Sequence, residues 1–283
     1  MSNTQTAQYS IYAILVAMIR QTQISATDEY TCLSKYLEEK LTDEKDDTKI
    51  KLHTIKSSGQ KKLQNYEKKL KDVSIRINRE EFDRKLSLTK HSLEIDKAVP
   101  YINKISYRYL AELTKITRTI CQDMDIDSPT AVESIIKLSF ATLALESYFG
   151  DYLSLKILIK KRTPYFFKKV YSVIGREWSD GLTQIKIGKN LPDFLLDRYE
   201  IKKNQLWIPE VSARATALTF AGYIHYLSRN GRAVKDITNN AEELLLNYHL
   251  GMQHTANPNF SYGTHTSKYV ARGKLYMSLI SYV

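Results

Sequence analysis

Large apolar side chains recur at helical spacing along the first half of the chain. Between residues 28 and 42 they return every three or four positions, which is the period of one helix face. From residue 60 the spacing is that of a heptad repeat, formed by Leu63, Tyr66, Leu70, Val73 and Ile77. After Pro100 similar spacing returns with Ile102, Ile105, Tyr109, Leu113, Ile116 and Ile120. The run from Leu63 to Ile77 covers fewer than three heptads. We therefore predict that it and the run after Pro100 form a helical hairpin packed within the chain, rather than an extended coiled coil.

Residues 9–19 form an apolar run that ends at Arg20. The run is too short to span a bilayer as a helix. Its length suits the core of a signal peptide cleaved near Ala26, but no Lys or Arg precedes it, whereas a signal peptide usually begins with positive charge. Two interpretations stand: a signal peptide through residue 26, or a short buried helix.

The segment 123–130 separates two regions of different character. Ser128 fits the N-cap of a helix and Pro129 its first residue. The residues that follow are more aromatic and less charged, and they include both tryptophans. We therefore predict three parts. Residues 1–26 form an apolar N-terminal segment, residues 27–127 a basic helical region, and residues 128–283 the domain that carries the chemistry.

The composition favours a mainly α protein with a polyanionic partner. Gly and Pro number only 10 and 6 in 283 residues, too few for the many tight turns of a β-barrel or sandwich. The net charge of +11 favours nucleic acid, an acidic membrane surface or the bacterial cell wall as partner. No CxxC or Cys/His cluster is present, so no metal site is expected, and Cys32 and Cys121 either pair or remain thiols.

The helix predicted from Pro129 carries an apolar face that ends in a carboxylate. Val132, Ile136, Ser139 and Leu143 form this face, and the next position on it is Glu146. A carboxyl that loses hydration has a raised pKa, which is what a general acid needs near neutral pH. The alternative is a helix-terminal Glu that faces solvent or pairs with a Lys.

Short motifs follow this helix in the order found in one enzyme family. They are Glu146-Ser147, Gly181-Leu182-Thr183-Gln184-Ile185, Gly222-Tyr223 with Tyr226-Leu227, Tyr248-His249-Leu250-Gly251, and Tyr269-Val270. Over roughly residues 128–280 the chain thereby resembles the lytic transglycosylases that have the soluble-lytic-transglycosylase domain, whose fold is lysozyme-like. Two positions depart from the family's pattern, because Thr183 stands in place of Met and His249 in place of Asn. The interval between Glu146 and Gly181 is also longer than usual.

The resemblance implies an enzyme that cleaves peptidoglycan with Glu146 as its one catalytic residue. Glu146 would protonate the oxygen between N-acetylmuramic acid and N-acetylglucosamine and then accept the proton of the C6 hydroxyl, which closes a 1,6-anhydro ring. Gln184 would hydrogen-bond to sugar, and Gly181 would allow a tight turn. The implied substrate-binding residues are Gln184, Tyr248, Gly181, Ser147 and Tyr269. No metal or organic cofactor is implied.

Several alternatives remain open. If Asp151 or Asp180 faces Glu146, it would activate water, and the protein would be a hydrolysing lysozyme. A non-catalytic glycan-binding module of an envelope machine or phage particle would dock to its assembly partner through the N-terminal helices. A nucleic-acid-binding protein would account for the charge, but no helix-turn-helix, RRM or zinc-finger signature is present.

The expected partner is therefore the glycan strands of peptidoglycan and not nucleic acid. The expected location is the periplasm or cell envelope, or a phage particle. Residues 160–169 place aromatic rings beside basic side chains; they would either line a groove for an anionic glycan or form a solvated basic helix face.

Overall fold

The computed structural model describes residues 64–88, 104–126, 128–147, 181–185, 193–251 and 263–283. These residues belong to one unit that spans residues 61–283. The mainly α prediction is confirmed, because 76% of the described residues are helical and their strands form one two-stranded sheet. The apolar segment 9–19 and the helix predicted over residues 28–42 lie outside the described residues.

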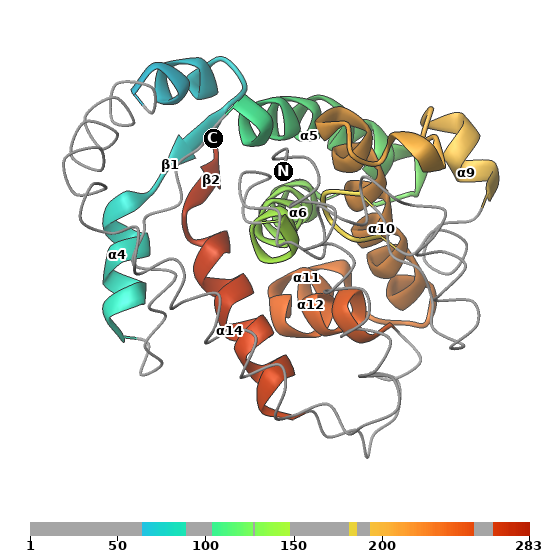
Figure 1. Cartoon of the computed structure of the whole chain (residues 1–283). Coiled ribbons are helices and arrows are strands. Elements are labelled where there is room, and N and C mark those ends of the chain that lie inside the picture. The colour runs from blue at the N-terminus through green and yellow to red at the C-terminus, as the bar shows by residue number, and fades with distance from the viewer. Residues whose placement is uncertain (1–63, 89–103, 127, 148–180, 186–192, 252–262) are drawn as a thin grey trace, which may run out of the picture. The chain divides into compact units, whose positions relative to one another are not determined.

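Helix α6 (Pro129–Ser147) lies at the centre of a bundle (Figure 1). Five helices contact it, namely α5 (Lys104–Asp123), α10 (Pro209–Arg229), α11 (Val234–Asn239), α12 (Ala241–Leu250) and α14 (Thr264–Met277). Apart from Glu133 and Lys137, its side chains from Ala131 to Ala144 are buried. Apolar side chains therefore cover most of its circumference, as expected for a helix enclosed by neighbours, and not one face alone as the sequence pattern suggests.

The predicted start of α6 is confirmed. Pro129 is the first helical residue, where its missing N–H costs nothing. The carbonyl of Ser128 accepts hydrogen bonds from the N–H groups of Ala131 and Val132. The hydroxyl of Ser128 pairs with that of Thr130 at 2.8 Å.

Helix α5 packs against both α6 and α10, so the predicted boundary after residue 127 falls inside one core. Tyr109 and Leu113 of α5 are fully buried. Two ion pairs also join α5 to α10, Arg108–Glu210 at 2.6 Å and Glu112–Arg214 at 2.9 Å. The change of composition near residue 127 marks the turn between α5 and α6, where Asp125 has a φ of 55°.

The heptad pattern predicted through Ile77 is wrong at its C-terminal end. The helix over residues 64–71 stops before Ser74, which has a φ of 59°. Strand β1 (Ile75–Ile77) follows and pairs antiparallel with β2 (Ile280–Tyr282), with Ile77 opposite Ile280. Ile75 and Ile77, which alternate with Arg76, are β-branched residues that suit a strand. Pairing with the distant strand β2 makes this segment a strand rather than a continuation of the helix.

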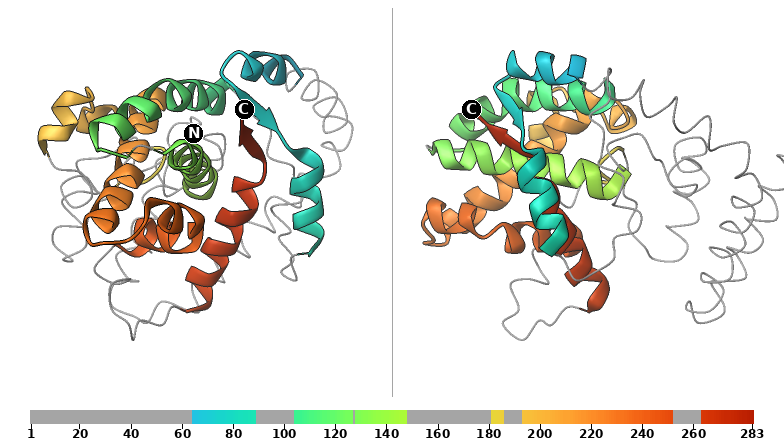
Figure 2. Two further views of the ribbon diagram at one scale, coloured as in Figure 1. Left: turned by 180° about the vertical axis from the view of Figure 1, so that it is seen from behind. Right: turned by 90° about the vertical axis from the view of Figure 1, so that its left-hand side faces the viewer.

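The remaining described elements lie at the edges of the bundle. Helix α4 (Arg79–Leu88) runs beside α14 (Figure 2) and contacts it. Its Phe82 stacks on Tyr276, with ring centroids 6.2 Å apart. Helix α9 (Asp193–Arg198) and the short 3-10 helix η2 (Lys203–Gln205) precede α10. Within the described ranges, no helix combines the length and the apolar character that crossing a bilayer requires.

Replacing Phe82 by Ala tests whether the segment before α5 belongs to the same core. The ring is fully buried, so we expect Phe82→Ala to lower the free energy of unfolding by about 3–5 kcal/mol. Denaturant unfolding followed by circular dichroism should still show one transition, shifted as a whole. The matched control is Phe194→Ala, whose ring is 71% exposed and whose effect should stay within about 0.5 kcal/mol. A separate early transition for the Phe82 variant, with the rest unchanged, would contradict a shared core.

Candidate active site

Glu146 lies in the last turn of α6 and is half-buried. The hydroxyl of Tyr269, from α14, donates a hydrogen bond to its Oε1 atom at 2.9 Å. Burial, together with the negative charge of Glu146 and this hydrogen bond, raises the pKa of Tyr269 well above its usual value. The phenol therefore stays protonated at physiological pH, so Tyr269 is always a donor to the carboxyl group.

Tyr248 reaches the same region from α12. Its ring stacks on Phe220 with centroids 5.1 Å apart, and its hydroxyl donates to the carbonyl oxygen of Thr183 at 2.7 Å. Burial raises the pKa of Tyr248 well above its usual value, and the charge of Glu146 raises it further. Because one carboxylate acts on both phenols, the structure brings together Glu146, Tyr248 and Tyr269, which the sequence analysis selected from three separate motifs.

The turn over residues 181–185 is held against α10 and the segment before it. Gly181 has a φ of 78°, and a Cβ atom there would lie 2.5 Å from both the Cβ and the carbonyl oxygen of Leu206. Only glycine fits such a position, so the predicted tight turn is confirmed. The fully buried hydroxyl of Thr183 is within hydrogen-bond distance of Ser212 at 3.1 Å and of Thr216 at 2.8 Å. Thr183, one of the two departures from the family's pattern, thus anchors the turn to α10.

Two further predicted residues form hydrogen bonds within their own elements. The side-chain Nε2 of Gln184 donates to the carbonyl of Gly181 at 2.8 Å and so closes the turn, in which Gln184 itself has a φ of 52°. The hydroxyl of Ser147 is fully buried and donates to the carbonyl of Leu143 at 3.0 Å, one turn earlier in α6. Both contacts are structural, and the predicted sugar contacts of these two residues stay predictions.

Tyr223 of α10 is a residue to which the sequence analysis assigned no role. It is 5% exposed, and within the described part of the chain its hydroxyl has no hydrogen-bond partner. Burial raises its pKa. Its ring and that of Tyr248 both pack against Phe220, with centroids 6.2 and 5.1 Å from that ring, so Tyr223 lies beside the cluster. A buried hydroxyl without a partner is costly in free energy, and a ligand that accepts its hydrogen bond would remove that cost.

Other candidates lie outside this cluster or outside the described residues. Asp151, Asp180 and the basic aromatic segment 160–169 are not among the described residues. No group of three metal-ligating side chains occurs in the described ranges. Cys121 is a buried free thiol, and burial raises its pKa to about 11.

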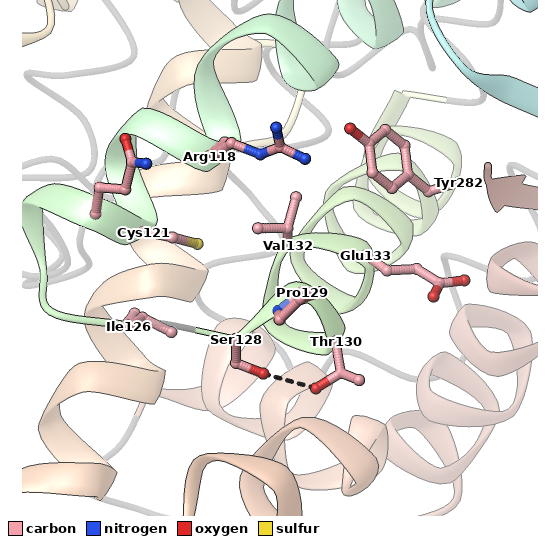
Figure 3. Close-up of a pocket in the computed structure, with 10 residues that line it drawn as sticks. Arg118, Cys121, Ile126, Ser128, Pro129, Thr130, Val132, Glu133 and Tyr282 are labelled. Atoms are coloured by element: carbon pink, nitrogen blue, oxygen red, sulfur yellow. Dashed lines mark hydrogen bonds between the residues drawn. The ribbon is translucent and has the colours of Figure 1, made fainter.

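A hollow of about 370 Å³ lies at the opposite end of α6 (Figure 3). Arg118 and Cys121 of α5 line it together with Ser128, Thr130 and Glu133. Because an α-helix rises about 1.5 Å per residue, the start of α6 is about 25 Å from Glu146. The hollow is therefore separate from the tyrosine cluster.

The cluster combines the carboxylate of Glu146 with the hydroxyls of Tyr223, Tyr248 and Tyr269. A half-buried carboxyl group beside hydroxyl donors is suited to moving a proton to and from a ligand that carries many oxygens. The chain matches no known family model, and no curated protein and no solved structure matches it.

Replacing two glycines by alanine tests the turn, because we expect opposite effects on the free energy of unfolding at the two positions. We expect Gly181→Ala to lower the free energy of unfolding by about 1–3 kcal/mol, because the left-handed conformation is strained and the new methyl group meets the backbone of Leu206. Gly222 lies within α10 with open space around it, so Gly222→Ala should raise the free energy of unfolding by about 0.5–1 kcal/mol. Thermal denaturation of both variants measures this difference, and equal effects would rule out the described turn.

Proposed function

We propose that this protein is a peptidoglycan lytic transglycosylase in which Glu146 is both the general acid and the base. One observation carries the proposal: the hydroxyl of Tyr269 donates a hydrogen bond to the carboxyl of Glu146 at the end of a buried helix. The order of the motifs around Glu146 supports the same reaction, because it is the order of the family that the chain resembles.

The hydrogen bond from Tyr269 decides which oxygen of Glu146 carries the acidic proton. A protonated phenol can donate to Oε1 whether the carboxyl group is charged or neutral. When Glu146 is protonated, its proton therefore belongs on Oε2. Such a fixed proton is what a general acid needs, because the donor must lie within hydrogen-bond reach of the leaving oxygen.

The proposed reaction proceeds in two steps. Protonated Glu146 transfers its proton to the glycosidic oxygen, and the bond between C1 of N-acetylmuramic acid and that oxygen breaks. The carbonyl of the substrate's own N-acetyl group stabilises the positive charge at C1. The Glu146 carboxylate then accepts the proton of the C6 hydroxyl, and O6 bonds to C1 to give the 1,6-anhydro product. No water is consumed, and Glu146 regains its proton.

The tyrosines around Glu146 would bind the sugar. The hydroxyl of Tyr223, which has no partner within the described residues, would donate a hydrogen bond to a sugar hydroxyl or to the N-acetyl carbonyl. Tyr248 would act mainly by holding the turn at Thr183 in place. The net charge of +11 suits the anionic peptide stems of the wall.

Substitution of Glu146 tests the proposal directly. Glu146→Gln keeps the shape of the side chain but cannot donate an acidic proton, so we expect the release of muropeptides from purified sacculi to fall by about 10²–10⁴-fold or more. Mass spectrometry should find 1,6-anhydro ends with the unaltered protein. The control is Glu133→Gln, near the start of the same helix, which should retain activity.

Each other outcome of this experiment selects a different function. Reducing ends in place of anhydro ends would identify a hydrolysing lysozyme. No release by the unaltered protein, where a reference enzyme acts, would identify a glycan-binding module. Equal activity of the Glu146→Gln variant would exclude Glu146 as the acid.

Removing a single hydroxyl tests the role of Tyr269. Tyr269→Phe keeps the ring but loses the hydrogen bond to Glu146, so kcat should fall roughly ten- to a hundredfold, which corresponds to about 1.5–3 kcal/mol. The control is Tyr226→Phe, whose ring lies on α10 and is 57% exposed. Rates on sacculi at several substrate concentrations give kcat and KM for both variants, and an unchanged kcat for Tyr269→Phe would remove Tyr269 from the mechanism.

A further inference from the structure

We propose that His249 is a positioning residue that holds Tyr269, and through it Glu146, in the orientation that the reaction needs. The inference rests on the proposed function and extends it to a residue at which the chain departs from the family that it resembles. It comes from a stack of rings between α12 and α14.

The imidazole of His249 lies flat against the ring of Tyr269. The ring centroids are 4.1 Å apart and the planes differ by 21°. The hydroxyl of the same Tyr269 donates to Glu146 at 2.9 Å. A continuous path of contacts therefore joins α12, α14 and α6 at the carboxyl group.

His265 extends the same stack. It lies one helical turn before Tyr269 on α14, and its ring centroid is 5.8 Å from that of His249 with the planes 25° apart. The imidazole of His249 thus contacts two rings on one face of α14. This contact opposes any tilt of Tyr269 away from the plane in which its hydroxyl meets Glu146.

The geometry of a tyrosine makes such support important. The hydroxyl is at the far end of the side chain, so a small tilt of the ring about its first side-chain torsion becomes a large displacement of the oxygen. A displacement of about 1 Å can cost about a hundredfold in rate. The hydrogen bond to Glu146 alone restrains the oxygen, whereas the stack restrains the whole ring.

The neighbouring residue on α12 is held in a comparable way. Tyr248 stacks on Phe220 and donates to the carbonyl of Thr183. Since adjacent residues on a helix point in different directions, the end of α12 supports both the turn that begins at Gly181 and the tyrosine that holds Glu146. An asparagine at position 249 has no ring, so it could not provide the second of these supports by stacking.

Three variants of His249 separate stacking from other roles. His249→Ala and His249→Asn remove the ring, and we expect each to lower kcat on sacculi about ten- to a hundredfold with KM changed less than about threefold. His249→Phe restores a flat ring and should bring kcat back to within about threefold of the unaltered protein. The control is Lys235→Ala, an exposed side chain on α11 that takes no part in the stack and whose removal should leave the activity unchanged.

Two results would overturn the inference. A His249→Phe variant as slow as His249→Ala would mean that stacking is not what position 249 provides. A loss confined to KM would mean that His249 binds substrate and does not position Tyr269. Melting temperatures of all variants exclude unfolding as the cause of a low rate.

A readout without substrate distinguishes this inference from the proposed function. We would incorporate 3-fluorotyrosine in place of Tyr269 and record ¹⁹F NMR spectra. His249→Ala should shift and broaden the resonance, His249→Phe should keep it narrow, and Glu146→Gln should shift it through the hydrogen bond. If the spectra change as expected but no anhydro products form, the proposed function alone would be overturned. If anhydro products form but His249→Ala changes neither the resonance nor kcat, the inference alone would be overturned.

Discussion

The enclosure of α6 by five neighbouring helices determines most of this architecture. A helix in that position is mostly apolar. Buried hydroxyls on it find partners on its own backbone or on a neighbour: Thr142 donates to the carbonyl of Leu138, and Ser134 donates to the carbonyl of Thr238. Its two carboxylates, Glu133 and Glu146, lie near the two ends of the helix, where their side chains are partly exposed. The length of the buried stretch before it therefore sets the position of Glu146.

The surroundings of Glu146 are partly desolvated but contain hydrogen-bond donors. Burial raises the pKa of Tyr223, Tyr248 and Tyr269, so none of the three carries a charge near neutral pH. Neutral donors of this kind suit the role proposed for Glu146, in which the carboxyl group releases a proton and then takes one back.

Local patterns predicted what depends on local sequence. The start of α6 at Pro129, the mainly α class and the turn at Gly181 all follow from residue types that act on their own backbone. The strand at Ile77 was missed because its partner is Ile280, and the role of Thr183 was missed because it depends on hydroxyls of α10. Tyr223 and Tyr226 are three positions apart in one motif, and only the packing of α10 distinguishes the buried hydroxyl from the exposed one.

The pairing of β1 with β2 also sets an order in time for a chain made from its N-terminus. Ile75 must wait for Tyr282, about 200 residues later, before the sheet can form. Helix α14, which directly precedes β2, carries Tyr269. A growing chain therefore contains Glu146 well before it contains Tyr269, and the strand that completes the sheet directly follows the helix that supplies the hydroxyl bonded to Glu146.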